Sequence, residues 1–285
     1  KNDEMITLAK FLAISGIILP MLPHKNLIPD INLTPYSIWL ATVVVSGISY
    51  LSYLLKRYVF HESGTLVSGI IGGLYSSTAT ISVLARKSRK ASEQEATDYV
   101  AAMLLAVSMM FLRFMILILI FSREIFLSIY PYLLTMAVVA AIVAWFIHSR
   151  QKRPEDQSAE TEEDDSSNPL EFKVALIFAV LFVIFTFLTH YTLVYAGTGG
   201  LNLLSFVSGF SDITPFILNL LQNTGSVAAL IITACSMQAI ISNIMVNMFY
   251  ALFFAGKGSK LRPWILGGFG VVIACNLVLL LFFYI

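Results

Sequence analysis

Residues 63–86 of this chain read SGTLVSGIIGGLYSSTATISVLAR. The stretch is apolar, yet glycines and hydroxyl residues stand in its middle, where an ordinary membrane span would carry leucine and isoleucine. Residues 199–222, GGLNLLSFVSGFSDITPFILNLLQ, have the same character. Glycine allows a chain to reverse, and Ser or Thr caps a helix that starts again. Both stretches therefore predict broken or re-entrant helical hairpins, which membrane proteins tolerate only around protein or a water-filled cavity.

The rest of the chain has the composition of a membrane protein. Of its 285 residues, 58% are hydrophobic and 12% are charged, whereas a soluble domain would carry about 25% charge. Mean hydropathy is +0.81. A membrane-spanning helix needs about 20 apolar residues. The sequence therefore predicts an all-α integral membrane fold, in which two hairpins accompany about seven transmembrane helices, at 5–21, 36–57, 97–121, 124–149, 170–194, 226–255 and 263–284.

The chain divides into two halves that resemble each other. Residues 1–33 hold an extra N-terminal helix, 34–149 form repeat 1 with hairpin 63–86, and 169–285 form repeat 2 with hairpin 199–222. The polar segment 150–168 reads as a solvated cytoplasmic linker. Thr34-Pro35 opens one repeat and Asn168-Pro169 the other, each as a helix cap followed by proline. GLYSSTATI (73–81) aligns with GFSDITPFI (209–217), and in this alignment Ser76 and Asp212 occupy the same position.

Basic residues near the segment ends favour hairpins that return to the side they entered. If both broken stretches re-enter, all twelve clustered charges fall on the cytoplasmic side, in agreement with the positive-inside rule. If both stretches span the membrane, only seven of these twelve charges fall on the cytoplasmic side. The clusters are Lys56-Arg57, Arg86-Lys87-Arg89-Lys90, Arg150-Lys152-Arg153 and Lys257-Lys260-Arg262. With three spans and one hairpin per half, the two repeats are inverted, as in many secondary transporters.

The alternative is that both broken stretches are ordinary spans whose glycines form packing faces. The polar residues of the two stretches likewise have a functional and a purely structural interpretation. Hydroxyls can line a shared site, or bond back to carbonyls of their own helix. Asp212 can carry a proton, bind a cation or pair with a base, or it can simply cap its half-helix. The candidate binding residues at the two tips are Ser76, Ser77, Thr78, Ser211, Asp212 and Thr214, with Thr214-Pro215 expected to open the second returning half-helix.

Polar residues on two long apolar helices complete the candidate set. Arg113 either snorkels to the outer membrane surface or faces the bundle and meets Asp212 or an anionic substrate. Gln238, Asn243 and Asn247 contact either the substrate or a neighbouring helix. In an alignment of the repeats at a spacing of 134 residues, Asn247 occupies the place of Arg113 and Ser242 that of Ser108.

Several classes of function find no support. The sequence has no HExxH motif, no nucleophile elbow and no glycine-rich phosphate loop, so we expect no enzyme and no cofactor. Cys235 and Cys275 lack the spacing of a metal site, although the sequence leaves the metal question open. A net charge of +1 argues against a nucleic-acid partner.

Five motifs resemble a particular bacterial family, the membrane domain of unknown function that follows an MgtC/SapB domain in many prokaryotic proteins. The present sequence carries no MgtC/SapB domain. The family pattern often has an acidic residue where Thr214 stands and a lysine where Asn247 stands. The resemblance covers nearly the whole chain and rests on GGLYSSTATISVLARKSR (72–89), MMFLR (109–113), NPLEFK (168–173), SGFSDITPF (208–216) and SNIMVN (242–247).

These observations predict a secondary carrier or facilitator for a small solute or ion, with its site at the two hairpin tips near the membrane midplane. The alternatives are an ion channel and a non-transporting scaffold or regulatory module. The expected partners are the lipid bilayer and the solute, and a homodimer is left open. We expect a multi-pass protein of the prokaryotic cytoplasmic (inner) membrane with a cytoplasmic N-terminus.

Overall fold

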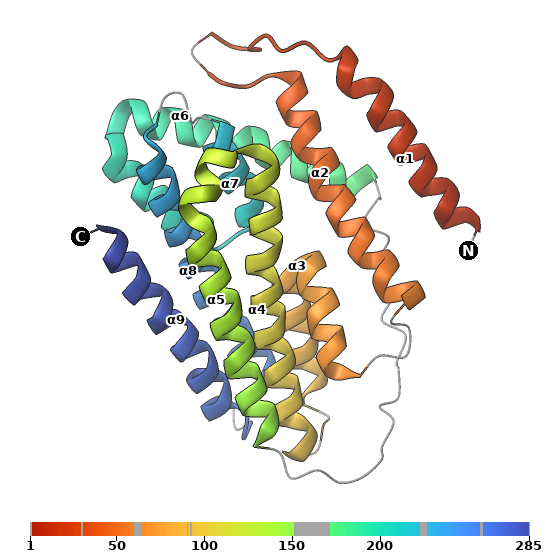
Figure 1. Cartoon of the computed structure of the whole chain (residues 1–285), viewed down its shortest axis with the longest axis vertical. Helices are drawn as coiled ribbons and strands as arrows, with labels where there is room; N and C mark the ends of the chain where they lie inside the picture. The colour runs from red at the N-terminus through yellow and green to blue at the C-terminus, as the bar shows by residue number, and fades with distance from the viewer. Residues whose placement is uncertain are drawn as a thin grey trace.

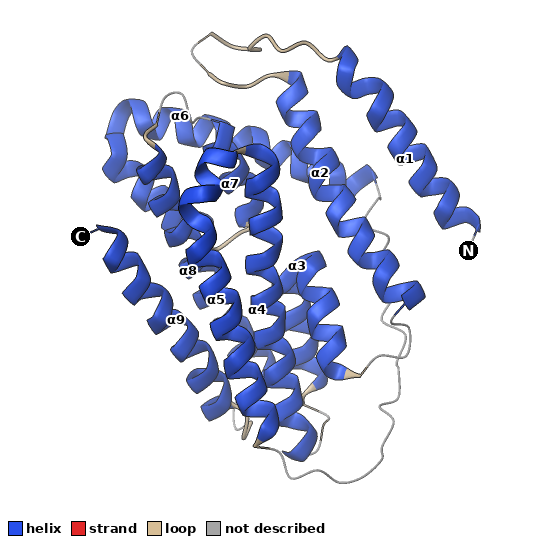
Figure 2. Ribbon diagram, in the orientation of Figure 1, coloured by secondary structure: helices blue, strands red, loops and turns tan. Residues whose placement is uncertain are grey.

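The computed structural model describes residues 2–29, 31–59, 64–89, 91, 93–150, 172–222, 227–256 and 259–284. Figure 2 shows helices and loops, and no strand, in this part of the chain. The helices are α1 (Asn2–Met21), α2 (Pro35–Leu54), a π-helical turn (Leu55–Val59), α3 (Thr65–Lys87), α4 (Glu93–Phe121), α5 (Arg123–Ser149), α6 (Phe172–Ser208), α7 (Ile213–Gln222), α8 (Ala229–Ala255) and α9 (Arg262–Tyr284).

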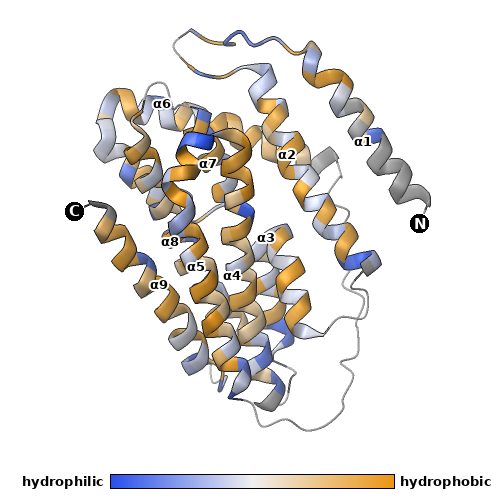
Figure 3. Ribbon diagram, viewed as in Figure 1, coloured by the Kyte–Doolittle hydropathy of each residue, from blue (hydrophilic) through white to orange (hydrophobic). Residues whose placement is uncertain are grey.

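Seven of the described helical segments are long and apolar enough to cross a membrane, as expected of a multi-pass membrane protein. Six of them coincide with helices predicted as spans. The seventh is α3 rather than the predicted run at 5–21, which forms α1. Large apolar side chains such as Trp145 and Phe282 point outward, 68% and 74% exposed, and Figure 3 shows apolar residues along the whole length of the bundle. The segments are Pro35–Tyr58, Thr65–Lys87, Glu95–Phe121, Arg123–Ser149, Ala175–Ser208, Ala229–Ala255 and Arg262–Phe282.

The predicted helix start at Thr34-Pro35 is confirmed in atomic detail. Thr34 Oγ1 accepts a hydrogen bond from Ser37 N at 3.0 Å, and Ser37 Oγ accepts one from Thr34 N at 3.2 Å. This reciprocal pair is a capping box, and Pro35 holds the first helical position, where its missing N–H costs nothing. The matching pair Asn168-Pro169 and the linker at 151–168 lie outside the described residues.

Helix α4 forms the centre of the bundle and packs tightly against α3 and α5 (Figure 1). Close approach to α3 depends on small residues. Gly69 lies against the backbone of Ala102, and Gly73 against the backbone of Ala106, where added Cβ atoms would come within 2.8 Å and 2.5 Å of main-chain carbon. Without a hydrophobic driving force between helices in lipid, such small-residue contacts are what hold helices together.

Helix α3 is two half-helices rather than one straight rod. Ser76 has extended backbone angles, φ −158° and ψ 105°, inside the helix. Gly72 lies against the side chain of Thr80, which is eight residues further on. In a continuous helix those two residues would be about 12 Å apart along the axis. The chain therefore bends back at Ser76, with an outgoing half at 65–75 and a returning half at 77–87.

Helix α6 breaks in a similar way at Gly197, before the second hairpin stretch. Gly197 has φ 59° and ψ −152°, a conformation open to glycine and strained for other residues. Gly200 lies against Thr192, eight residues earlier, so the chain turns back here as well. The half-helix 198–208 then leads into a turn at 209–212 and into α7. Figure 1 shows the first part of α6 running obliquely across the bundle.

Both ends of α3 lie at the lower end of the bundle in Figure 1, together with the end of α8 and the start of α9. Two arginines join these ends. Arg89 donates a hydrogen bond to the carbonyl of Phe253 at 3.2 Å, and the guanidinium of Arg86 stacks 4.3 Å from the ring centroid of Phe254. The last turn of α8 thus gains a cation at its negative end, an arrangement that stabilises a helix C-terminus.

Candidate functional site

The turn inside α3 is held by a hydroxyl and a guanidinium. Ser76 Oγ accepts a hydrogen bond from Ala79 N at 3.4 Å, which makes Ser76 the cap of the returning half-helix. Arg113 on α4 donates from Nη1 to the carbonyl oxygen of Tyr75 at 2.7 Å. A half-helix ends with unpaired carbonyls and a partial negative charge. Arg113 therefore satisfies the end of the outgoing half-helix with a full positive charge.

The turn between the half-helix 198–208 and α7 is capped by Asp212. Its Oδ1 accepts a hydrogen bond from Thr214 N at 2.9 Å, and α7 begins at Ile213. The sequence prediction that Thr214 caps this helix, with Pro215 first, is therefore wrong by two positions. Asp is as good a cap as Ser or Thr, and its charge suits the positive end of a helix. Thr214 is buried in the second position.

Arg113 faces the bundle, as one of the two sequence alternatives predicts. Its side chain is 8% exposed, which is too buried for a residue that snorkels to the membrane surface. Asp212 lies near enough to attract it electrostatically. The guanidinium thus donates to a carbonyl of the first turn and is attracted by the carboxylate of the second turn. The Nε atom of Arg113 is buried and has no hydrogen-bond partner among the described residues.

On α8, two asparagines lie in series behind the second turn. Asn243 donates from Nδ2 to the carbonyl of Gly209 at 3.2 Å, and Asn247 donates from Nδ2 to Asn243 Oδ1 at 3.1 Å. Asn243 is thus the polar side chain that satisfies the end of the half-helix 198–208. Gly209 packs directly on Ser242 and Asn243, which stand near the middle of α8. The second turn therefore lies halfway along a helix of spanning length.

The other predicted site residues have mostly local partners. Ser211 Oγ bonds back to the carbonyl of Ser208 at 3.1 Å, the local bonding that is routine for such hydroxyls. Gln238 Oε1 accepts a hydrogen bond from Ser205 at 2.7 Å, about a turn and a half before Asn243 on α8. Ser77 is buried and Thr78 is half-buried, both at the start of the returning half-helix.

Contacts that the sequence did not suggest support both turns. The carbonyl of Tyr75 is invisible to motif reasoning, because every residue carries one. Behind the second turn, Asn219 donates to Thr186 Oγ1 at 2.6 Å, and Cys235 Sγ donates to Asn202 Oδ1 at 3.3 Å. Asn202 and Asn219 belong to the polar residues of 199–222, so the sequence indicated that these side chains need partners. It could not indicate which helix supplies the partner, because that depends on packing.

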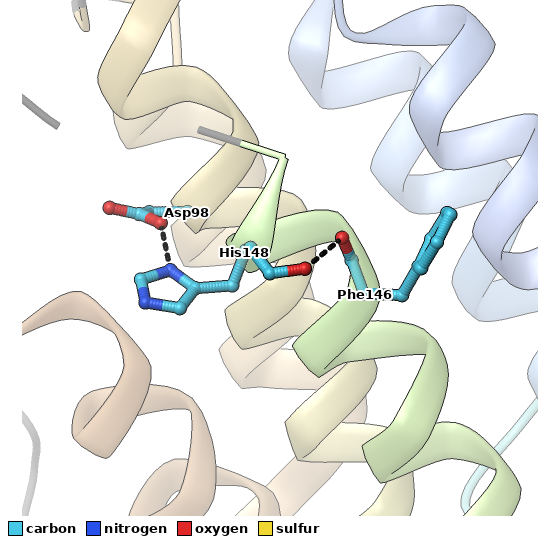
Figure 4. Close-up of polar contacts among 4 residues, drawn as sticks. Asp98, Phe146 and His148 are labelled. Atoms are coloured by element: carbon cyan, nitrogen blue, oxygen red, sulfur yellow. Dashed lines mark hydrogen bonds and ion pairs between the residues drawn. The ribbon is translucent and has the colours of Figure 1, made fainter. Parts of the chain in front are cut away.

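Two other features lie apart from the turns. Figure 4 shows Asp98 of α4 and His148 of α5 pointing toward each other, with His148 Nδ1 and Asp98 Oδ1 2.6 Å apart. This pair joins the start of α4 to the end of α5. A pocket of about 430 Å³ between α5 and α9 is lined mainly by apolar atoms, including Pro131, Tyr132 and Leu279. Neither feature gathers groups from both turns, and no cluster of metal-ligating side chains occurs among the described residues.

The arrangement around Arg113 brings together groups of opposite charge and helix ends of opposite polarity. Arg113 and Asn243 cover the negative ends of the two outgoing half-helices, while the positive ends of the two returning half-helices begin at Ser76 and Asp212. Each such end carries roughly half an elementary charge. Asp212 is exposed, although it lies in the turn that packs on the middle of α8. A carboxylate at such a depth in a membrane needs water or a partner, because lipid would cost roughly 2.5–3.5 kcal/mol.

Comparison with known proteins gives a family and no activity. An uncharacterized protein of Aquifex aeolicus (strain VF5) is 25% identical over 227 residues, covering 78% of this chain and 96% of that protein. No solved structure matches. A family model described as a domain of unknown function, DUF4010, matches residues 43–255, a range that includes both turns, Arg113 and the two asparagines. Because this match covers most of the sequence, the chain belongs to the DUF4010 family of domains of unknown function.

Proposed function

We propose that the protein is a membrane carrier for a small polar solute, with its binding site between the turns at Ser76 and Asp212. The observation that carries the proposal is the position of Arg113. It is a buried cation on a long apolar helix, bonded to the carbonyl of Tyr75 and attracted by Asp212. Charged residues inside membrane helices are costly and mark substrate or ion pathways. Broken helices that meet around such a group are typical of secondary transporters.

In this proposal both hairpins are re-entrant and the two halves are inverted repeats. A constant spacing of 136 residues between matching contacts supports the repeat. The outgoing half of each hairpin meets the following long helix at equivalent points, and each contact in the second half lies 136 residues after its counterpart. The contacts are Gly69–Ala102 and Gly73–Ala106 in the first half, and Ser205–Gln238 and Gly209–Ser242 in the second.

This spacing corrects one detail of the sequence alignment. A spacing of 134 paired Ser108 with Ser242 and Arg113 with Asn247, whereas the contacts pair Ala106 with Ser242. Two residues amount to about 200° around a helix, which is nearly the opposite face. Arg113 and Asn247 are therefore not counterparts. Each half holds its turn with a side chain of its own kind, a guanidinium from α4 and an amide from α8.

The membrane topology gives the first prediction. Tyr58 and Ala91 flank the first hairpin, and cysteines placed at these two positions in a protein lacking Cys235 and Cys275 should lie on the same side of the membrane. A membrane-impermeant maleimide added to intact cells should leave both unlabelled and should label both after lysis. Glu124→Cys, at the turn between α4 and α5, is the control that should react in intact cells. Labelling of one flank and protection of the other would mean that α3 spans, and the inverted arrangement would be wrong.

Solute flux tests the function itself. Purified protein in liposomes should move at least one small polar solute down its gradient, in a screen of radiolabelled amino acids, carboxylates, divalent cations and nucleosides. Flux should saturate with solute concentration, since a carrier binds its solute once per cycle. Protein-free liposomes give the background. Absence of flux for every class contradicts the proposal and favours a scaffold or regulatory module, and unitary currents in planar bilayers would identify a channel instead.

The expected setting of this carrier is the prokaryotic cytoplasmic membrane, with Lys56, Arg57 and the other clustered basic residues on the cytoplasmic side. The absence of enzymatic activity and of nucleic-acid binding stay predictions, and a homodimeric assembly stays an open alternative. They follow from the sequence alone.

A further inference from the structure

Two buried polar atoms near the turns have no hydrogen-bond partner in the described part of the chain: Arg113 Nε and Asn247 Oδ1. Arg113 is 8% exposed and Asn247 is fully buried. An unpaired buried polar group costs about 1–3 kcal/mol, so native proteins keep few of them. Seven such atoms occur among the described residues, and each calls for an explanation such as strain, a bound water or ion, or a functional role. These two belong to side chains that are linked to the polar turns, where a bound solute can satisfy them.

The chemical role of each atom is fixed by its neighbours. Asn243 must present its amide nitrogen to the carbonyl of Gly209, because a carbonyl only accepts. Asn243 Oδ1 then accepts from Asn247 Nδ2, which leaves Asn247 Oδ1 as an acceptor. Arg113 Nε carries a hydrogen and only donates. The site therefore offers one unpaired donor with positive charge and one unpaired acceptor.

Both side chains are linked to the turn at 209–212, Arg113 through the charge of Asp212 and Asn247 through Asn243. Arg113 approaches it from α4 and is attracted by Asp212. Asn247 approaches it from α8 through Asn243, which donates to Gly209. Asp212 adds a second acceptor, this one charged and exposed. The groups around this turn thus divide into a positive donor on one helix and negative or neutral acceptors on another helix and on the turn.

We propose that this site binds a small zwitterion, an α-amino acid, with its carboxylate on Arg113 and its ammonium group on Asp212 and Asn247 Oδ1. This proposal rests on the carrier function and names its substrate class. A simple cation would leave Arg113 Nε unpaired and would be repelled by the guanidinium. A phosphate or dicarboxylate would be repelled by Asp212 and would leave Asn247 Oδ1 without a donor. A zwitterion satisfies both atoms and adds no net charge to the membrane interior.

The test separates the two charged ends of the ligand. Thermal unfolding of purified protein is followed with glycine and L-alanine, then with each other protein amino acid, and with acetate and methylammonium as single-ended probes. At least one amino acid should raise the unfolding temperature, because ligands stabilise the state they bind. Its dissociation constant should be at least about tenfold below that of either single-ended probe. Equally tight acetate would make this an anion site, equally tight methylammonium a cation site, and no response to any amino acid would also refute the proposal.

Two substitutions on α8 localise the binding. Asn247→Leu keeps the side-chain size and removes the acceptor together with the donor to Asn243 Oδ1, so amino-acid binding should weaken about tenfold or more while acetate binding changes little. Ser236→Ala is the matched control, because Ser236 bonds the carbonyl of Ile232 in its own helix and should bind as the unaltered protein does. Equal loss of both ligands in Asn247→Leu would assign that residue a structural role. Amino-acid binding without flux would uphold this site and refute the carrier, and acetate flux without amino-acid binding would do the reverse.

Discussion

Replacing Arg113 with glutamine should reduce solute flux to the level of empty liposomes. The variant loses the positive charge that faces Asp212 and the charged hydrogen bond to the carbonyl of Tyr75, which is 2.7 Å long. A hydrogen bond from a charged group contributes about 1.5–3 kcal/mol, so the unfolding temperature in detergent should fall measurably. Flux should fall further than stability explains, because the same charge binds the solute. The measurement is initial flux per folded protein in liposomes.

Two further variants separate the charge of Arg113 from its other contributions. Arg113→Lys keeps the charge but lacks Nε and the planar donor pattern, so part of the stability should return while flux stays low. Arg113→Gln combined with Asp212→Asn should be more stable than Arg113→Gln alone, since no unpaired carboxylate remains. Arg123→Gln, at an exposed position at the start of α5, is the matched control and should leave both quantities unchanged. Normal flux in Arg113→Gln would remove the guanidinium from the mechanism.

The sequence predicted the parts of the site that depend on local chemistry. Glycines followed by hydroxyl residues placed a break within 72–78, and the non-helical residue is Ser76. Thr34-Pro35 located the start of α2, since a capping residue and proline act within one turn. An arginine in an apolar helix left two alternatives, a side chain that snorkels to the membrane surface or one that faces the bundle, and the burial of Arg113 agrees with the second. Each of these inferences needed only the residue and its immediate neighbours.

The features that could not be predicted from the sequence are contacts that depend on how the helices pack. Under the proposed repeat, the sequence pairing of α4 with α8 at a spacing of 134 differs by two residues from the contacts of Gly73 and Gly209, because two long apolar helices carry few residues that fix their alignment. For the cap of α7 the sequence offered both Thr214, because Thr-Pro is a common helix start, and Asp212, which caps equally well, and the structure shows Asp212 in that role. The partner of Arg113 in the first turn is a main-chain carbonyl, which no side-chain pattern can reveal.

Substitutions of Asp212 should have the second large effect on solute flux. At this position the effect of the charge on flux can be measured separately from the effect of the helix cap on stability. Asp212→Asn should fold normally, because asparagine caps a helix as well as aspartate does and can still accept from Thr214 N. Flux should nevertheless fall at least about tenfold, since the variant has no carboxylate to balance Arg113 or to bind a positive group on the solute. Asp212→Ala should show the same loss of flux and an additional loss of about 1 kcal/mol of stability, the usual contribution of a helix cap.

The control for Asp212 is a second cap with no charge and no contact with the site. Ser122 caps α5 by accepting a hydrogen bond from Ile125 N at 3.3 Å. Ser122→Ala should lose a similar amount of stability and keep its flux, because only the helix end is affected. If Asp212→Asn transports normally, the aspartate only caps α7, and the solute site must be formed by Arg113 and the amides of α8. If Asp212→Asn fails to fold instead, the carboxylate is needed to neutralise Arg113, and the combined variant with Arg113→Gln should restore folding.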